Sequence, residues 1–189
     1  FAAFSAHKMY GPTGIGALYG TTSALNLMPP TLFGGSMITY VDYERAEYLP
    51  APAKFEPGTP RLSQAVGWAA SLDVLSAIGL ESIAAHEREL GKLLYDLVEP
   101  LPGIRILGTR DNVERVGLLS VAVDGVHPHD VGQFLDSRGI AVRVGHHCAQ
   151  PLHRRLGVDS STRFSVGMHT TRAEIEFAVD VLAQVRAYF

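Results

Sequence analysis

The period of the hydrophobic pattern changes along the chain and divides it into two parts. Up to about residue 60 the apolar residues stand in short runs separated by glycine and proline, which favours strands and loops. From Ser63 they recur every three or four positions, which predicts amphipathic helices. Beyond Pro102 short apolar runs alternate with helical segments. The pattern therefore indicates two bodies, with a hinge around residues 50–80.

The first part predicts two buried strands, a short helix and a long loop. Residues 1–5 form an apolar run that reads as a strand already in progress, and residues 14–20 form a second run. A short helix is predicted at 22–28, and a polar, proline-bearing loop follows as far as Arg61. Because the first run needs neighbouring strands for its backbone groups, we expect the chain to be the C-terminal part of a longer protein.

Two long helices are predicted in the middle of the chain. In the first, Val66, Leu72 and Leu75 share one apolar face. In the second, which begins after Ser82, leucines recur on one face until Pro102 ends the pattern. Both helices should therefore pack against neighbouring structure.

The remainder predicts strand, strand, helix, strand, strand and helix, which indicates an α+β unit with helices on one face of a sheet. The strands are expected at residues 104–107, 116–123, 140–144 and 162–166. The helices are expected at residues 127–138, closed by Gly139, and after the capping box Thr171-Arg172-Ala173-Glu174. Four residues of the last helix should face inward: Ile175, Ala178, Val179 and Leu182.

Composition narrows the classes of partner and the compartment. The formal net charge is −3 and no basic stripe stands out, which argues against nucleic acid as a partner. A single cysteine cannot form an internal disulfide, so we expect a reducing, cytoplasmic location. No apolar run approaches the roughly 18 residues of a membrane span, and no basic-then-apolar leader is visible, so no membrane partner is expected.

A lysine stands between the first strand and a glycine-rich turn, in Ser5-Ala6-His7-Lys8-Met9-Tyr10-Gly11-Pro12-Thr13-Gly14-Ile15-Gly16. Such an amine could form a Schiff base with a carbonyl cofactor, or Lys8 could be a surface residue beside a turn. Ser5 and His7 could donate hydrogen bonds to a phosphate, or could simply end the strand and lie half-buried. Thr59, between Gly58 and Pro60, has the same two interpretations: phosphate donor or ordinary turn residue.

The only cysteine follows two histidines, in Arg143-Val144-Gly145-His146-His147-Cys148-Ala149-Gln150-Pro151. Successive side chains diverge, so three adjacent residues rarely share one zinc ion, and we expect no metal site. A nearby histidinium or Arg143 would favour the thiolate of Cys148 and raise its reactivity. Lone cysteines are also often buried and inert, but the turn favours a reactive thiol.

An arginine on the last predicted strand is a candidate for binding an anion. Arg163 is flanked by small and apolar residues in Ser161-Thr162-Arg163-Phe164-Ser165, so it could hold a carboxylate with both guanidinium nitrogens. An exposed strand arginine is the alternative. Arg61 and Gln64, at the start of a helix, could touch a ligand or only water.

The two long motifs resemble those of one known family. The Lys8 segment resembles the pyridoxal-phosphate lysine region of cysteine desulfurases. The Cys148 segment resembles the active-cysteine loop of their group II, Suf-type branch, and the serine-rich cysteine loop of group I is absent. Two further segments fit the same family: Gly34-Gly35-Ser36-Met37-Ile38 and Phe55-Glu56-Pro57-Gly58-Thr59-Pro60. The resemblance covers essentially the whole chain.

The resemblance implies an α/β fold, fold type I of the pyridoxal-phosphate enzymes, as in aspartate aminotransferase. Residues 1–60 would be the end of the cofactor-binding large domain. Residues 61–189 would be a linking helix and the C-terminal α+β small domain.

The resemblance also implies roles for the cofactor-binding residues. Lys8 would hold pyridoxal 5'-phosphate covalently and act as a catalytic residue, and Ser5 and His7 would bind its phosphate. Thr59 would reach the phosphate bound by a partner subunit, which implies a homodimer.

The remaining implied roles concern the substrate and the sulfur. Arg163 would hold the carboxylate of L-cysteine, with Arg143 as a second substrate-binding residue. Cys148 would take the sulfur as a persulfide, leaving L-alanine, and pass it to an acceptor protein for iron–sulfur clusters or other sulfur delivery. His146 or His147 could manage the thiol protons, and the sequence does not choose between them.

Two departures from the family pattern keep other functions open. The family usually has Met-Tyr-Asn-Thr where this chain has Met168-His169-Thr170-Thr171, which keeps a related selenocysteine lyase or C–S β-lyase as an alternative. The family's ring-stacking histidine and its pyridine-pairing aspartate belong to an upstream half that this sequence does not contain. We therefore expect activity only together with that half. A non-catalytic fragment or sulfur-relay module that presents Cys148 is the alternative of another class.

Overall fold

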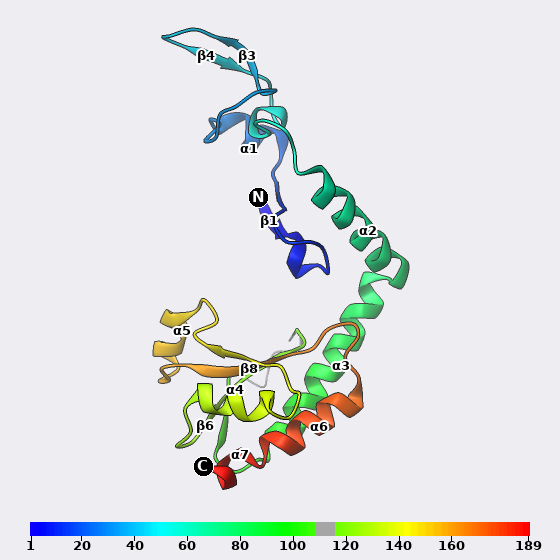
Figure 1. The fold of residues 1–189 in the computed structure, drawn as a ribbon, viewed down its shortest axis with the longest axis vertical. Coiled ribbons are helices and arrows are strands. Elements are labelled where there is room, and N and C mark those ends of the chain that lie inside the picture. Colours follow the sequence, from blue (N-terminus) through cyan, green and yellow to red (C-terminus); the bar gives the residue numbers. More distant parts are fainter. Residues whose placement is uncertain (109–115) are drawn as a thin grey trace. The chain divides into compact units, whose positions relative to one another are not determined.

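A computed structural model describes residues 1–108 and 116–189, and its contacts divide the chain into two compact units, Phe1–Ile78 and Gly79–Phe189 (Figure 1). The division falls at the end of helix α2 (Leu62–Ile78), so this helix groups with the first unit. The assignment of residues 1–60 to a large domain and of residues 61–189 to a linking helix and small domain stays a prediction.

The first unit begins with a two-stranded antiparallel sheet. Strand β1 (Ala2–Ser5) pairs with β2 (Gly16–Tyr19), and Ser5 lies opposite Gly16. A single 3-10 turn, η1 (Ala6–Lys8), continues β1 directly, and the short helix α1 (Thr22–Leu27) follows the sheet. Both strands and the helix were predicted. The predicted burial of the strands is wrong within this unit, since every residue of β2 is exposed.

The long segment before Arg61 is not the structureless loop that its composition predicts. It contains a hairpin of β3 (Ile38–Val41) and β4 (Ala46–Tyr48), and a second 3-10 turn, η2 (Ala53–Phe55). Asp42 closes the hairpin: its carboxylate accepts the backbone N–H groups of Glu44 and Arg45, each at 2.8 Å. These two N–H groups and the Tyr40 hydroxyl lower the pKa of Asp42.

Helix α2 is present where the pattern predicts it, but its predicted apolar face is wrong. Val66 and Leu72 are exposed and Leu75 is buried. The helix is apolar on all sides rather than along one stripe, so the spacing of its apolar residues did not select the face that packs.

The second unit is a four-stranded antiparallel sheet with strand order β5-β6-β8-β7 and helices between its strands. In chain order its elements are α3 (Leu80–Val98), β5 (Ile104–Leu107), β6 (Leu118–Val123), α4 (Pro128–Asp136), β7 (Arg143–Gly145), α5 (Gln150–Arg155), β8 (Ser161–Ser165), α6 (Arg172–Leu182) and α7 (Val185–Tyr188). The predicted strand and helix order is confirmed, with α5 and α7 added to it.

One apolar core holds the second unit together. Helices α3 and α4 pack against the sheet, α6 packs against both helices, and the core forms among these elements (Figure 1). Leu94, Val121, Leu135 and Leu182 are fully buried there. The four residues of α6 that were predicted to face inward are all buried. The predicted α+β unit with helices on one face of its sheet is confirmed.

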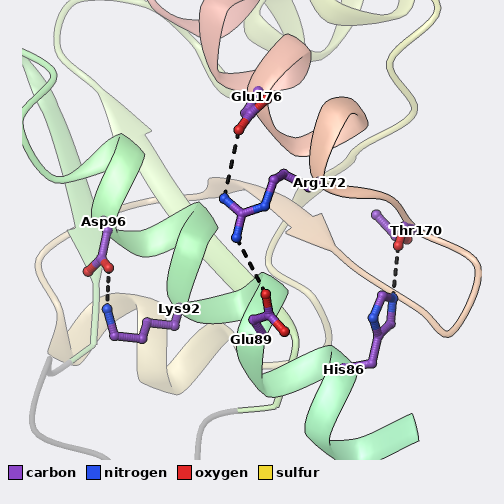
Figure 2. A network of polar contacts seen from close by, with 7 residues as sticks. All are labelled: His86, Glu89, Lys92, Asp96, Thr170, Arg172 and Glu176. Atoms are coloured by element: carbon purple, nitrogen blue, oxygen red, sulfur yellow. Dashed lines mark hydrogen bonds and ion pairs between the residues drawn. The ribbon is translucent and has the colours of Figure 1, made fainter.

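Polar contacts tie α6 to α3 at the edge of this core (Figure 2). Arg172 lies 3.4 Å from the carboxylate of Glu89 on α3 and 3.8 Å from that of Glu176 on its own helix. The predicted capping box at Thr171 and Glu174 is present. Backbone and hydroxyl donors of Thr171 lower the pKa of the Glu174 carboxyl.

Within the described ranges no single helix is long and apolar enough to span a membrane. Helices α2 and α3 taken together as a bent pair would be, by length and composition only.

Candidate active site

The turn that carries Lys8 is closed by backbone hydrogen bonds around Ala6, which is fully buried. The Ala6 carbonyl accepts the N–H groups of Met9 and Gly11 at 2.8 and 2.9 Å, and the Ala6 N–H donates to the Ile15 carbonyl at 3.1 Å. This closure turns the chain back into β2 and leaves Lys8 on the exposed side.

Helix α2 supports this turn from one side. The Ser71 hydroxyl donates to the Tyr10 carbonyl at 3.1 Å. A side chain at position 11 would lie 2.9 Å from the Ala6 carbonyl oxygen and 3.0 Å from Cδ1 of Trp68, so only glycine fits. The backbone of the lysine turn is therefore fixed by the first unit itself.

The side chains of Ser5, His7 and Lys8 on the lysine turn have no polar partners among the described residues, whereas the backbone of the turn is fixed by hydrogen bonds. Ser5 is half-buried and His7 and Lys8 are exposed. Among the residues that the structure describes, none makes a side-chain hydrogen bond or ion pair with these three. An amine, an imidazole and a hydroxyl on one turn suit a ligand that carries both an aldehyde and a phosphate. The donor set therefore fits pyridoxal phosphate.

Thr59 lies on a separate loop of the first unit. The Gly58 N–H donates to the Gly35 carbonyl at 2.8 Å, which places the two glycine-bearing segments side by side. Thr59 itself is exposed. Its predicted role toward a partner subunit stays a prediction.

The cysteine turn joins β7 to α5 through left-handed backbone. His147 and Cys148 have φ angles of 52° and 62°, a region that costs a residue other than glycine roughly 1–2 kcal/mol. The Ala149 N–H closes the turn on the His146 carbonyl at 2.8 Å. Cys148 is exposed, and Nη2 of Arg143 lies 3.5 Å from its Sγ. The predicted exposed thiol beside an arginine is present.

Two arginines lie opposite each other next to this turn. Arg143 on β7 and Arg163 on β8 are cross-strand partners, and like charges in that position repel. Nε of Arg163 donates to the Ser165 hydroxyl at 3.2 Å, and neither arginine forms an ion pair within the described residues. A bound anion would relieve their repulsion, so the pair suits a carboxylate or a thiolate.

Two histidines near the thiol meet at one serine hydroxyl. Nε2 of His147 and Nε2 of His153 each lie 2.9 Å from Oγ of Ser161. Burial, and then electrostatic interactions with Arg163, His153 and Arg143, lower the pKa of His147, so its ring is neutral near pH 7. No hydrogen bond within the described residues joins the His146 or His147 ring to the thiol.

The segment that departs from the family pattern folds into a turn of its own. The Thr170 hydroxyl accepts the Gly167 N–H at 3.0 Å, and the Thr170 carbonyl lies 2.9 Å from Nε2 of His86 (Figure 2). Thr171 then caps α6. The hydroxyl at position 170 therefore closes the turn, and the hydroxyl at position 171 caps α6.

Among the described residues, no three His, Cys, Asp or Glu side chains converge in a way that could hold a metal ion.

The family is decided by a comparison of the whole sequence. The family model described as aminotransferase class-V matches residues 1–177. The chain belongs to the class-V aminotransferase family. Enzymes of this family use pyridoxal phosphate.

Within this family, the chain is similar to proteins that are named cysteine desulfurases. The chain is 48% identical over 189 residues to a probable cysteine desulfurase of Streptomyces coelicolor, covering 100% of this chain and 45% of the relative. Its fold matches the cysteine desulfurase CsdA of Escherichia coli at 35% identity, with a TM-score of 0.92 over 99% of this chain and 46% of that one. It also matches the apo cysteine desulfurase of Thermococcus onnurineus at 34% identity, with a TM-score of 0.93 over 99% of this chain and 47% of that one.

These comparisons confirm the predicted fold, an α/β fold that matches the C-terminal portion of class-V pyridoxal-phosphate enzymes. The chain spans less than half the length of the relatives named above.

The predicted site residues fall into two groups, one in each unit. Ser5, His7 and Lys8 share one turn of the first unit. Cys148, Arg143 and Arg163 come together in the second. Sequence reasoning missed the link through Ser161 and His153, because His153 lies on α5, a helix that was not predicted. The roles of all these residues stay predictions.

Proposed function

We propose that this chain supplies the covalent lysine, the carboxylate site and the sulfur-accepting thiol of a group II cysteine desulfurase. The observation that carries the proposal is the exposed Cys148 thiol, presented on a left-handed turn with Arg143 at its sulfur and Arg163 alongside. Similarity to cysteine desulfurases over the whole chain supports it. The glycine, two histidines and cysteine of this turn support the group II branch.

When bound, pyridoxal phosphate supplies an electron sink for the substrate α-carbon. The Lys8 amine would hold the cofactor, and Ser5 and His7 would donate to its phosphate. Thr59 would serve the phosphate bound by the second subunit of a homodimer.

The chain's own residues would carry the proton, the carboxylate and the sulfur. The Lys8 amine would take the α-proton of L-cysteine, while Arg163 would hold the substrate carboxylate through both guanidinium nitrogens. The Cys148 thiolate would then form an S–S bond with the substrate sulfur as the carbon–sulfur bond breaks. The electron pair of that bond stays with carbon, which is protonated to L-alanine, and Cys148 is left as a persulfide.

We further propose that the persulfide is handed to an acceptor protein in the cytoplasm. An exposed thiol near two arginines oxidises readily, so it suits a reducing compartment. The acceptor would serve iron–sulfur clusters or other sulfur delivery.

The test uses the full-length protein loaded with pyridoxal phosphate. Lys8→Ala should lose the visible absorbance of the bound cofactor, whereas Lys54→Ala, a lysine on the same unit that donates to the Asn26 carbonyl, should keep it. Cys148→Ala should keep the colour and form no protein-bound persulfide from L-cysteine.

The alternatives give different outcomes in the same experiment. Full alanine production by Cys148→Ala would favour a C–S lyase, because the thiol would then be dispensable. A full-length protein that binds no cofactor would favour a non-catalytic sulfur-relay module.

A further inference from the structure

Ser161 occupies the centre of a chain of hydrogen bonds behind the cysteine turn. The residue is fully buried on β8, and its hydroxyl lies 2.9 Å from a ring nitrogen of each of two histidines, His147 and His153. A hydroxyl has one proton, so it can donate to only one of the two rings and must accept from the other.

The direction of this chain is set at its far end. Nδ1 of His153 lies 3.0 Å from the Ala149 carbonyl, which can only accept, so Nδ1 carries the proton. With its proton on Nδ1, His153 accepts the Ser161 O–H through the lone pair on Nε2. The Ser161 oxygen in turn accepts the Nε2–H of His147. Each ring is thereby restricted to one tautomer.

The last atom of the chain is left without a partner. In the tautomer assigned above, Nδ1 of His147 carries a lone pair, and it is buried with no hydrogen-bond partner among the described residues. A proton there would be an N–H with nothing to receive it, close to the positive charges of Arg143 and Arg163. The arrangement therefore accommodates His147 only as a neutral donor to Ser161.

This donor bond fastens the cysteine turn to the sheet. His147 and Cys148 are the two left-handed residues of the turn, and β8, which carries Ser161, also carries Arg163. Without the bond to Ser161, the side chain of His147 would have no hydrogen-bond partner among the described residues, and the turn could relax to a less strained backbone. Cys148 would then move relative to Arg143.

We propose that Ser161, supported by His153, is a positioning residue that holds His147 and thereby keeps the Cys148 sulfur beside Arg143. This inference rests on the proposed function and adds one residue to the same site. Ser161 touches neither the thiol nor the arginine in the described contacts, so its effect passes through His147.

The first experiment compares Ser161→Ala with Thr162→Val in the full-length protein loaded with pyridoxal phosphate. Thr162 is the next buried residue on β8, and its hydroxyl donates to the Pro128 carbonyl at 3.4 Å, so its variant removes a hydroxyl away from the turn. The three readouts are amide hydrogen exchange of peptides covering residues 145–149, the single-turnover rate of persulfide formation, and KM for L-cysteine.

We expect Ser161→Ala to speed exchange of these peptides about tenfold, the scale of one net hydrogen bond. Persulfide formation at saturating L-cysteine should slow by a similar factor, with KM unchanged within about twofold. Thr162→Val should match the parent in all three measurements. A merely structural role for Ser161 would lower the amount of folded protein and leave the rate per folded site unchanged.

A second pair of variants tests the tautomer and serves if Ser161→Ala does not fold. The amide N–H of His147→Gln can reach Ser161 in place of Nε2–H, whereas the shorter side chain of His147→Asn cannot. We expect the glutamine variant to retain the slow exchange and the fast persulfide step. The asparagine variant should behave like Ser161→Ala.

Three results would overturn the positioning role: Ser161→Ala matching Thr162→Val, the glutamine and asparagine variants behaving alike, or a raised KM with an unchanged single-turnover rate. The proposed function and the role of Ser161 can fail separately. If the parent protein forms no persulfide but Ser161→Ala still exchanges faster at residues 145–149, the proposed function is overturned and the hold of Ser161 on the turn is supported.

Discussion

The lysine turn and the cysteine turn both follow a strand, but they are fixed by different parts of the chain. Backbone hydrogen bonds around Ala6, together with α2, hold the lysine turn, and its side chains remain open. Side chains hold the cysteine turn, through Arg143 at the sulfur and His147 at Ser161. Under the proposed function this difference has a reason: a lysine that binds a large cofactor needs open surroundings, whereas a thiol that meets one sulfur atom gains from being oriented in advance.

The two units that carry these turns also differ in how many apolar side chains each buries. In the first unit the buried hydrophobic residues are Ala6, Met37 and Leu75, while Leu18 and Tyr19 of β2 are exposed. In the second unit, buried residues from the sheet and from α3, α4 and α6 form one continuous core. The second unit therefore contains its own apolar core, whereas the first buries few apolar side chains within itself.

The largest expected effect is a difference in whether each unit folds when it is expressed alone. Residues 79–189 expressed alone should fold and melt cooperatively, because their core is contained within the unit. Residues 1–78 expressed alone should show no cooperative transition. Circular dichroism during heating checks both, and a sharp melting transition of residues 1–78 would break the comparison.

A smaller effect is expected on the free energy of unfolding when the core of the second unit is changed. Leu94→Ala removes a fully buried side chain of α3 and should lower the free energy of unfolding by about 2–5 kcal/mol. Leu152→Ala, on the exposed side of α5, should change it by less than about 0.5 kcal/mol. Urea unfolding of residues 79–189 gives both values, and equal losses would show that Leu94 does not pack as described.

The lysine turn should respond to crowding of its backbone. Gly11→Ala would place a methyl group against the Ala6 carbonyl and Trp68, and should cost about 1–3 kcal/mol and reduce the cofactor held by the full-length protein. A side chain at Gly35 would meet nothing within 4 Å, so Gly35→Ala is the matched control. Visible absorbance per protein and the melting temperature are the measurements. Full cofactor loading of Gly11→Ala would mean that α2 does not fix the turn.

The smallest expected effect is a pH dependence confined to the cysteine turn. Burial, and then electrostatic interactions with Arg163, His153 and Arg143, lower the pKa of His147 below its ordinary 6.5, so below that pH the unfolded chain takes up a proton that the folded ring does not. Stability from this site is therefore complete above pH 6.5 and declines as the pH falls toward the lowered pKa.

His147→Gln should remove that decline, since the amide does not titrate. Urea midpoints of residues 79–189 at pH 7.5 and 5.5, parent against variant, check the difference. Identical midpoint changes in the two proteins would show that His147 does not carry the effect.

The elements with strong local signals could be predicted from the sequence. The strand at residues 104–107 and the capping box before α6 were placed correctly, because alternation and cap chemistry are local. The β3–β4 hairpin was missed, although Ile38-Thr39-Tyr40-Val41 is a run of β-formers, because its polar, proline-bearing surroundings read as loop. Helix α5 was missed because it has only six residues. Pro151 in its first turn, a position where proline favours the start of a helix, was a signal that could have found it.

The residues of the candidate site likewise fall into those with a local signal in the sequence and those without one. Lys8 and Cys148 could be identified because their motifs are contiguous in the sequence. The cross-strand pairing of Arg143 with Arg163 depends on the sheet order, which no local pattern encodes. The same holds for Ser161, an ordinary strand serine until β8 brings it between two histidines.

The place of β7 in the sheet has a consequence for the exposed thiol. This strand lies at one end of the order β5-β6-β8-β7 and is three residues long. An outer strand so short offers a foreign chain little template for growing the sheet, and so limits aggregation. The exposed Cys148 thus follows an outer strand that leaves few open hydrogen-bonding positions for pairing with a second copy of the chain.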